Sequence, residues 1–285
     1  METVMKSNQV HEVVKTGYAE IARKGGGCCG PAEEKATTCC DSAAPTTQAQ
    51  TASRIGYTEE DVTGPAAEAN LGLGCGNPTA LASLEPGETV VDLGSGAGFD
   101  ALLSAEKLGP QGRFIGVDMT PEMLERARTN AVNAGYARTV EFREGLIENL
   151  PVASDSADVV ISNCVINLSP DKPQVFREAY RVLKPGGRLA VSDILLTQPL
   201  PRDVAELATS WIACVGGAST EDEYFEHIRA AGFEGLEYTR KPASTVLTAD
   251  LQDPLWKAAV ELIGEDRIRE LSDTVFSYSI TAKKP

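Results

Sequence analysis

Histidine and positive charge are scarce in this chain of 285 residues. It has two His, and its 26 Lys and Arg residues stand against 41 Asp and Glu residues, which gives a net charge of −15. So few histidines nearly exclude a metal site built on imidazole ligands. The shortage of basic residues argues against a surface that binds nucleic-acid phosphates, so we expect no nucleic-acid partner. The acidity itself needs no explanation beyond solubility.

Long apolar runs are also missing. No stretch approaches the roughly 20 apolar residues that a membrane helix needs, and the first residues, METVMKSNQVHEVVK, are too polar for a secretory signal. We therefore expect a cytoplasmic protein with no membrane partner, and a monomer. In that compartment the seven cysteines should be mostly thiols rather than structural disulfides. No Cys-x-x-Cys pair is present to suggest a zinc site.

Three regions follow one another along the chain. Residues 1–60 begin with a helical pattern over about 4–23, then turn into a Gly-, Ala-, Thr- and Cys-rich stretch from Cys28 to about Thr51, which predicts a loop or flexible arm. Residues 61–200 alternate apolar strands with amphipathic helices. Residues 201–285 predict a smaller α+β region that covers the substrate, including a helix that begins at Thr220 with a capping box to Glu223.

The alternation predicts an α/β fold with a doubly wound, mostly parallel, Rossmann-like sheet. The expected helices after the first cover residues 99–108, 121–134, 172–183 and 203–214, and the last of the first five strands follows a Pro-Gly-Gly turn. The expected strands cover residues 89–93, 113–117, 140–142, 157–162 and 188–194, and two late strands over 236–240 and 275–282 complete the sheet.

The first of these strands runs into the glycine loop Gly94-Ser95-Gly96-Ala97-Gly98. Glycines let a ligand approach the backbone closely, and ligands bind at the carboxyl ends of parallel strands. A dinucleotide fingerprint requires a glycine where this chain has Phe99, so NAD binding is the weaker interpretation. Asp118 ends the next strand, 20 residues beyond Gly98, where an acidic side chain accepts hydrogen bonds from ribose hydroxyls.

Preceded by Asp92, the loop resembles motif I of the class I S-adenosylmethionine methyltransferases, and LKPGG at 183–187 resembles the turn before the fifth strand of that superfamily. The resemblance implies S-adenosylmethionine as cofactor, with adenine lined by the loop 144–150. Leu146 stands where many relatives have Asp, which leaves the backbone to recognise the adenine edge. The cofactor residues that it implies are Asp92, Gly94, Ser95, Gly96, Gly98, Asp118, Met119, Leu146, Ile147, Asn163 and Tyr18.

The cysteines fall into two groups. Three are single: Cys75 in a glycine-rich turn, Cys164 after the fourth strand at the carboxyl edge of the sheet, and Cys214 at the end of a predicted helix. Any one of them alone is most simply a buried, inert thiol. The other four form vicinal pairs in an arm that offers no core to bury them: Cys28, Cys29, Cys39 and Cys40. Together the seven predict a thiophilic acceptor such as trivalent arsenic, which binds three sulfurs and keeps a lone pair.

Segments LGLGCGNP (71–78), ISNCVINLS (161–169) and WIACVGGA (211–218) closely resemble the arsenite methyltransferases of bacteria and archaea. The resemblance implies that arsenite and methylarsenite are substrates and that Cys164 and Cys214 bind the arsenic. It implies for Cys75 and an N-terminal cysteine a role in binding or in a disulfide exchange relay, recycled by thioredoxin or glutathione. Our hypothesis is that Cys75, Cys164 and Cys214 together hold the arsenic. Tyr18 is the candidate lid over the cofactor, and Leu73 replaces an aromatic residue of the family.

Two alternatives remain at this point. One is a small-molecule C- or O-methyltransferase in which the cysteines are incidental. The other is a non-enzymatic thiol protein that binds the metalloid without the cofactor.

Overall fold

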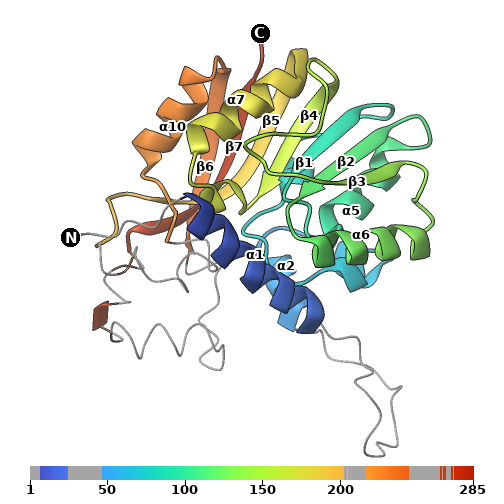
Figure 1. Ribbon diagram of the computed structural model, residues 1–285, viewed down its shortest axis with the longest axis horizontal. Helices are drawn as coiled ribbons and strands as arrows, with labels where there is room; N and C mark the ends of the chain where they lie inside the picture. Colours follow the sequence, from blue (N-terminus) through green and yellow to red (C-terminus); the bar gives the residue numbers. More distant parts are fainter. Residues whose placement is uncertain are drawn as a thin grey trace, which may run out of the picture.

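The computed structural model describes residues 7–24, 47–201, 204, 216–243, 264, 266–267, 271 and 273–285. Its centre is a seven-stranded sheet in the order β3-β2-β1-β4-β5-β7-β6 (Figure 1). The first five strands run parallel, and β7 lies antiparallel between β5 and β6. The predicted Rossmann-like class is therefore confirmed. The strands are β1 Thr89–Leu93, β2 Arg113–Asp118, β3 Val140–Glu144, β4 Ala157–Asn163, β5 Leu183–Leu196, β6 Glu234–Pro242 and β7 Val275–Lys283.

Helices cover both faces of this sheet. On one face α7 (Lys172–Val182) and α10 (Glu221–Ala230) lie against β5 and against each other, and their apolar sides join one buried cluster with residues of the central strands. On the other face α4 (Pro78–Leu81), α5 (Phe99–Leu108) and α6 (Pro121–Asn133) bury a second apolar cluster. Alternate residues of the central strands enter the two clusters, as the period of two in a strand requires. No helix in the described part of the chain is long and apolar enough to cross a membrane.

The N-terminal helix α1 (Ser7–Lys24) lies on the loops that follow the parallel strands (Figure 1). Its His11 Nε2 is 3.0 Å from Glu148 Oε1, and Arg126 Nη1 donates to the carbonyl of Ala22 at 2.8 Å. Both partners belong to the parallel-sheet part of the chain, so α1 is anchored near both ends across the carboxyl edge of the sheet. The remaining short elements near this edge are α2 (Thr47–Arg54), α3 (Glu59–Thr63), η1 (Ala67–Ala69) and η2 (Ile166–Leu168).

Three sequence predictions can be compared with these bounds. The stretch predicted as a loop to about Thr51 ends in helix α2 from Thr47, so that part of the prediction is wrong; residues 25–46 lie outside the described part. β5 begins at Leu183 rather than at 188, because Leu183 pairs with Ala157 before a shift in register, and the LKPGG segment is part of the strand. The capping box of Thr220 and Glu223 is confirmed. Of the helix predicted over 203–214, only residue 204 is described.

Candidate active site

A pocket opens at the carboxyl edge of β1, β2 and β4, beneath α1. The glycine loop forms its floor, with left-handed backbone at Gly94 (φ 77°) and Gly96 (φ 50°), and a Cβ on Gly96 would meet no atom within 4 Å. Backbone is therefore open to a ligand there. Of the predicted cofactor residues, those that line the pocket are Tyr18, Asp92, Gly94, Ser95, Gly96, Asp118, Met119, Leu146, Ile147 and Asn163. Gly98 does not line it; it begins α5 and packs against Phe142 and Ala127.

Asp118 is held in place by backbone donors. Its Oδ2 accepts from the N–H of Gly96 at 2.9 Å, and its Oδ1 accepts from the N–H of Thr120 at 2.8 Å. Burial raises the pKa of Asp118, while these backbone donors act in the opposite direction. The carboxylate thus lies at the pocket wall in a fixed orientation, as a group that accepts ribose hydroxyls must.

Two further carboxylates lie at the same end of the pocket. Burial raises the pKa of Asp92 well above its ordinary value, and the negative charges of Asp100 and Asp118 raise it further. Burial likewise raises the pKa of Asp100. A positively charged ligand beside these groups would offset both the repulsion and the loss of hydration. The donor set therefore fits a cofactor that carries an ammonium and a sulfonium charge.

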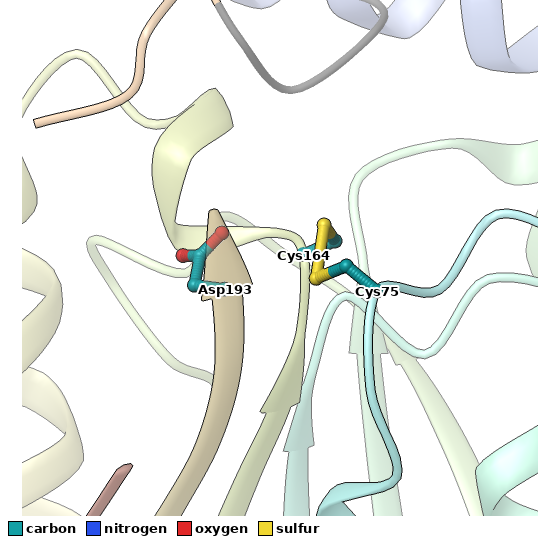
Figure 2. Close-up of side chains that lie close together, drawn as sticks. All are labelled: Cys75, Cys164 and Asp193. Carbon is teal, nitrogen blue, oxygen red and sulfur yellow. A yellow bond between two sulfur atoms is a disulfide. The ribbon is translucent and has the colours of Figure 1, made fainter. Parts of the chain in front are cut away.

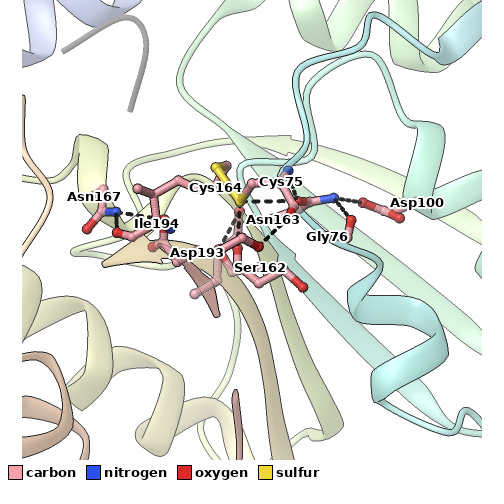
Figure 3. Close-up of a disulfide and its surroundings, with 12 residues drawn as sticks. Cys75, Gly76, Asp100, Ser162, Asn163, Cys164, Asn167, Asp193 and Ile194 are labelled. Carbon is pink, nitrogen blue, oxygen red and sulfur yellow. Dashed lines mark hydrogen bonds between the residues drawn. A yellow bond between two sulfur atoms is a disulfide. The ribbon is translucent and has the colours of Figure 1, made fainter. Parts of the chain in front are cut away.

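Asn163 joins this acidic end to the cysteine turn (Figure 3). Its Nδ2 donates to Gly76 O at 3.0 Å, Tyr57 Oη at 3.1 Å and Asp100 Oδ2 at 3.2 Å, and its Oδ1 accepts from the N–H of Cys75 at 3.0 Å. Tyr57 in turn donates to Asp100 Oδ1 at 2.6 Å. A single amide thus fixes the cysteine turn against the wall of the pocket.

Cys75 and Cys164 form a disulfide, with Cα atoms 5.8 Å apart (Figure 2). The cysteines were expected to be mostly thiols, and this pair is an exception. The physical reason is that hydrogen bonds hold the two cysteines next to each other. The N–H of Cys164 donates to Ser192 O at 2.8 Å, while Asn163 holds Cys75 beside Cys164. The pocket residues Gly74, Asn163 and Val165 are chain neighbours of the two cysteines.

Both cysteines are buried, at 1% exposure for Cys75 and 4% for Cys164. Gly76 allows close packing of the Cys75 turn, since a Cβ on Gly76 would clash with Ser192 Oγ. Cys164 has φ 62°, a left-handed conformation that a cysteine rarely adopts. The other predicted sulfur positions, Cys214, Cys28, Cys29, Cys39 and Cys40, lie outside the described residues.

Asp193 of β5 completes the cluster. Its carboxylate and the sulfurs of Cys75 and Cys164 offer atoms that all lie within 4.8 Å of one another (Figure 2). The side chain is fully buried, and burial raises its pKa to about 7, while the hydroxyl of Tyr224 and the nearby Lys172 act in the opposite direction. Asp193 was not predicted as a site residue, because SDI at 192–194 resembles the end of an ordinary apolar strand.

Tyr57, Asp100 and His11 were missed as well. Asp100 and Tyr57 follow no motif, and they meet across 43 residues only in the folded chain. His11 belongs to α1 and lines the pocket together with Val14 and Tyr18. The one sequence signal for Asp100 was its position as an acidic residue in the first turn of α5.

The glycine loop, the fixed Asp118 and the parallel sheet define the class: this is a methyltransferase domain of the Rossmann-like kind. Residues 84–232 match the family model described as a methyltransferase domain. A solved geranyl diphosphate methyltransferase shares the fold, with a TM-score of 0.57 at 17% identity over 77% of this chain and 85% of that one. At that identity the likeness concerns the fold alone.

More similar proteins narrow the class. An arsenite methyltransferase of Halobacterium salinarum is 46% identical over 97% of this chain and 67% of its own length. One of Aquipseudomonas alcaligenes is 44% identical over 56% of this chain and 47% of its own length. The solved arsenic(III) S-adenosylmethionine methyltransferase of Chlamydomonas reinhardtii has a TM-score of 0.56 and 31% identity, covering 85% of this chain and 74% of that one. The chain belongs to the arsenite methyltransferase family, and it spans between about half and three quarters of these relatives.

Proposed function

We propose that this chain methylates trivalent arsenic bound to its own thiols, with S-adenosylmethionine as methyl donor, and so detoxifies arsenite. The observation that carries the proposal is the position of the sulfurs of Cys75 and Cys164. The two sulfurs are bonded to each other at the carboxyl edge of the sheet, and the chain neighbours of both cysteines line the cofactor pocket. A methyl acceptor held there lies beside the place where a methyl donor binds.

Arsenic binding begins from the reduced pair. A dithiol or glutathione system, which we propose as the cellular reductant, returns the disulfide to two thiols with two electrons and two protons. Two thiols then replace two hydroxyl groups of arsenite, forming two As–S bonds and releasing two waters. Cys214 remains the proposed third sulfur, and the N-terminal cysteines remain the proposed relay. We further propose a cytoplasmic monomer in which residues 201–285 cover the acceptor, 61–200 bind the cofactor and 1–60 supply the arm.

The residues of the pocket do the positioning. The glycine loop and Asp118 would hold the ribose and methionine parts, and Tyr18 of α1, which lines the pocket, would cover them. S-adenosylmethionine supplies a methyl group on a positively charged sulfur. Because Cys75 and Cys164 are buried, an acceptor bound to their sulfurs would be shielded from water. Fixed orientation of two reactants is worth several powers of ten in rate. No general base is required, because the lone pair of arsenic carries no proton.

The test is methylation of arsenite by the purified chain with S-adenosylmethionine and a thiol reductant, followed by separation of the arsenic species. We expect methylated arsenic from the wild type and a loss of at least 100-fold in Cys164→Ser, with cofactor binding retained. Val132→Ser, on the exposed surface of α6, is the matched control and should keep full activity. Retained arsenite methylation by Cys164→Ser would contradict the proposal and favour an acceptor that needs no thiol.

A further inference from the structure

Asp193 is the acidic side chain that lies beside the two sulfurs in the described part of the chain. Its carboxylate lies within 4.8 Å of both Sγ atoms and is fully buried (Figures 2 and 3). The hydroxyl of Tyr224 donates to Oδ2 at 2.9 Å, while Asn167 Nδ2 and the N–H of Ile194 donate to Oδ1 at 2.8 and 2.9 Å. Three donors fix the carboxylate before any substrate arrives. Such a preorganised charge is what stabilises a transition state most effectively.

The charge of the substrate changes during the proposed reaction. Arsenic bound to thiolate sulfurs is neutral, with its lone pair unshared. When that lone pair forms the As–C bond, the S–C bond of the sulfonium breaks and its electron pair stays on sulfur. The positive charge therefore moves from sulfur to arsenic, and arsenic is oxidised from the trivalent to the pentavalent state. A negative group beside the arsenic favours this movement, whereas it has little effect on the neutral bound arsenic.

We propose that Asp193 stabilises the positive charge that develops on arsenic during methyl transfer. The inference rests on the proposed function. It assigns to Asp193 an electrostatic role in the transition state, distinct from the arsenic-binding role of the thiols. A purely structural role, as the acceptor that holds Tyr224 and Asn167, is the competing explanation.

Asp193→Asn tests the charge, because the side chain keeps its shape and still offers an acceptor to its neighbours. We expect kcat for arsenite to fall at least 10-fold, with KM for arsenite and for S-adenosylmethionine within about threefold of wild type. Tyr224→Phe is the comparison: it removes one of the three donors to the same carboxylate and leaves the charge, so its kcat should fall less than that of Asp193→Asn. Phenylarsine oxide reacts with two thiols to give a neutral dithiolate and releases one water. Its affinity should be unchanged in both variants, which also shows that both variants are folded.

A second measurement needs no turnover. In the reduced protein without cofactor, a carboxylate this close to two thiols opposes thiolate formation. Asp193→Asn should therefore raise the rate of alkylation of Cys75 and Cys164 by iodoacetamide severalfold at pH 7.5, and Tyr224→Phe should raise it less. An active Asp193→Asn enzyme with unchanged kcat, or an unchanged alkylation rate, would overturn the inference alone. A wild-type chain that transfers no methyl group to arsenite would instead remove the proposed function, and this inference with it.

Discussion

Asn163→Asp is the substitution whose effect follows most directly from the structure. The change leaves the size of the side chain unaltered and replaces the donor Nδ2 by an oxygen. That atom carries two hydrogens, which it shares among three acceptors, Gly76 O, Tyr57 Oη and Asp100 Oδ2, at 3.0, 3.1 and 3.2 Å. At roughly 1 kcal/mol for each N–H, their loss lowers the free energy of unfolding by about 2 kcal/mol. Repulsion from the carboxylate of Asp100 adds to this loss.

The assay is thermal unfolding under reducing conditions, so that the disulfide contributes nothing. At about 2 °C per kcal/mol for a chain of this size, Tm should fall by roughly 4 °C at pH 8. At pH 5 the fall should be smaller, because the new carboxyl gains a proton and regains one donor. Asn133→Asp, exposed at the end of α6, is the control and should change the stability by less than about 0.5 kcal/mol. A loss below about 1 kcal/mol at both pH values, or a larger loss at pH 5, would refute the reasoning.

Three further outcomes are expected. Asp118→Ala should weaken S-adenosylmethionine binding at least 10-fold by calorimetry while arsenite binding to the reduced thiols persists; equal affinity would mean that the carboxylate does not hold the cofactor. Tyr57→Phe should lower the free energy of unfolding by about 1–2 kcal/mol in urea, because the buried Asp100 loses a donor; an unchanged midpoint would contradict this. Arg143 and Arg113 lower the pKa of Glu141 to about 2, so the contribution of Glu141 to the free energy of unfolding is present above pH 4.5 and is lost as pH falls toward 2. The Glu141 side chain is 43% exposed, so Glu141→Gln should change the pH dependence of the free energy of unfolding by less than about 1 kcal/mol. A larger change would show that solvent screens the pair poorly.

The sheet was predictable because its information is local. Buried parallel strands give continuous apolar runs such as ADVVIS, and the helices between them show their own period and begin at recognisable residues. The cofactor half of the site was predictable for the same reason. A glycine loop must follow the first strand directly, and Asp118 must end the second, so both features are fixed by short stretches of sequence.

The acceptor half depends on contacts that no spacing encodes. Cys75 and Cys164 are 89 residues apart, and Asp193 reaches them from the part of β5 beyond the LKPGG segment. Their meeting depends on the pairing of β4 with β5, because the Cys75 turn contacts Asn163 of β4 and Ser192 of β5. Asn163 was expected as a cofactor residue, but its hydrogen bond to the Cys75 turn could be recognised only in the folded structure. The disulfide was not predicted, because the rule that cytoplasmic cysteines are mostly thiols describes the average cysteine. Whether Cys75 and Cys164 can bond depends instead on their proximity at the carboxyl edge of the sheet.

The left-handed backbone of Cys164 sets stability and chemistry in conflict at one position. In the reduced protein, Gly or Asn at 164 would adopt φ 62° more readily than cysteine does. If stability alone were under selection, substitutions that replace Cys164 would be favoured. Only selection for the proposed arsenic chemistry would preserve the thiol. In a lineage released from arsenic exposure, position 164 should be among the first of the site to change.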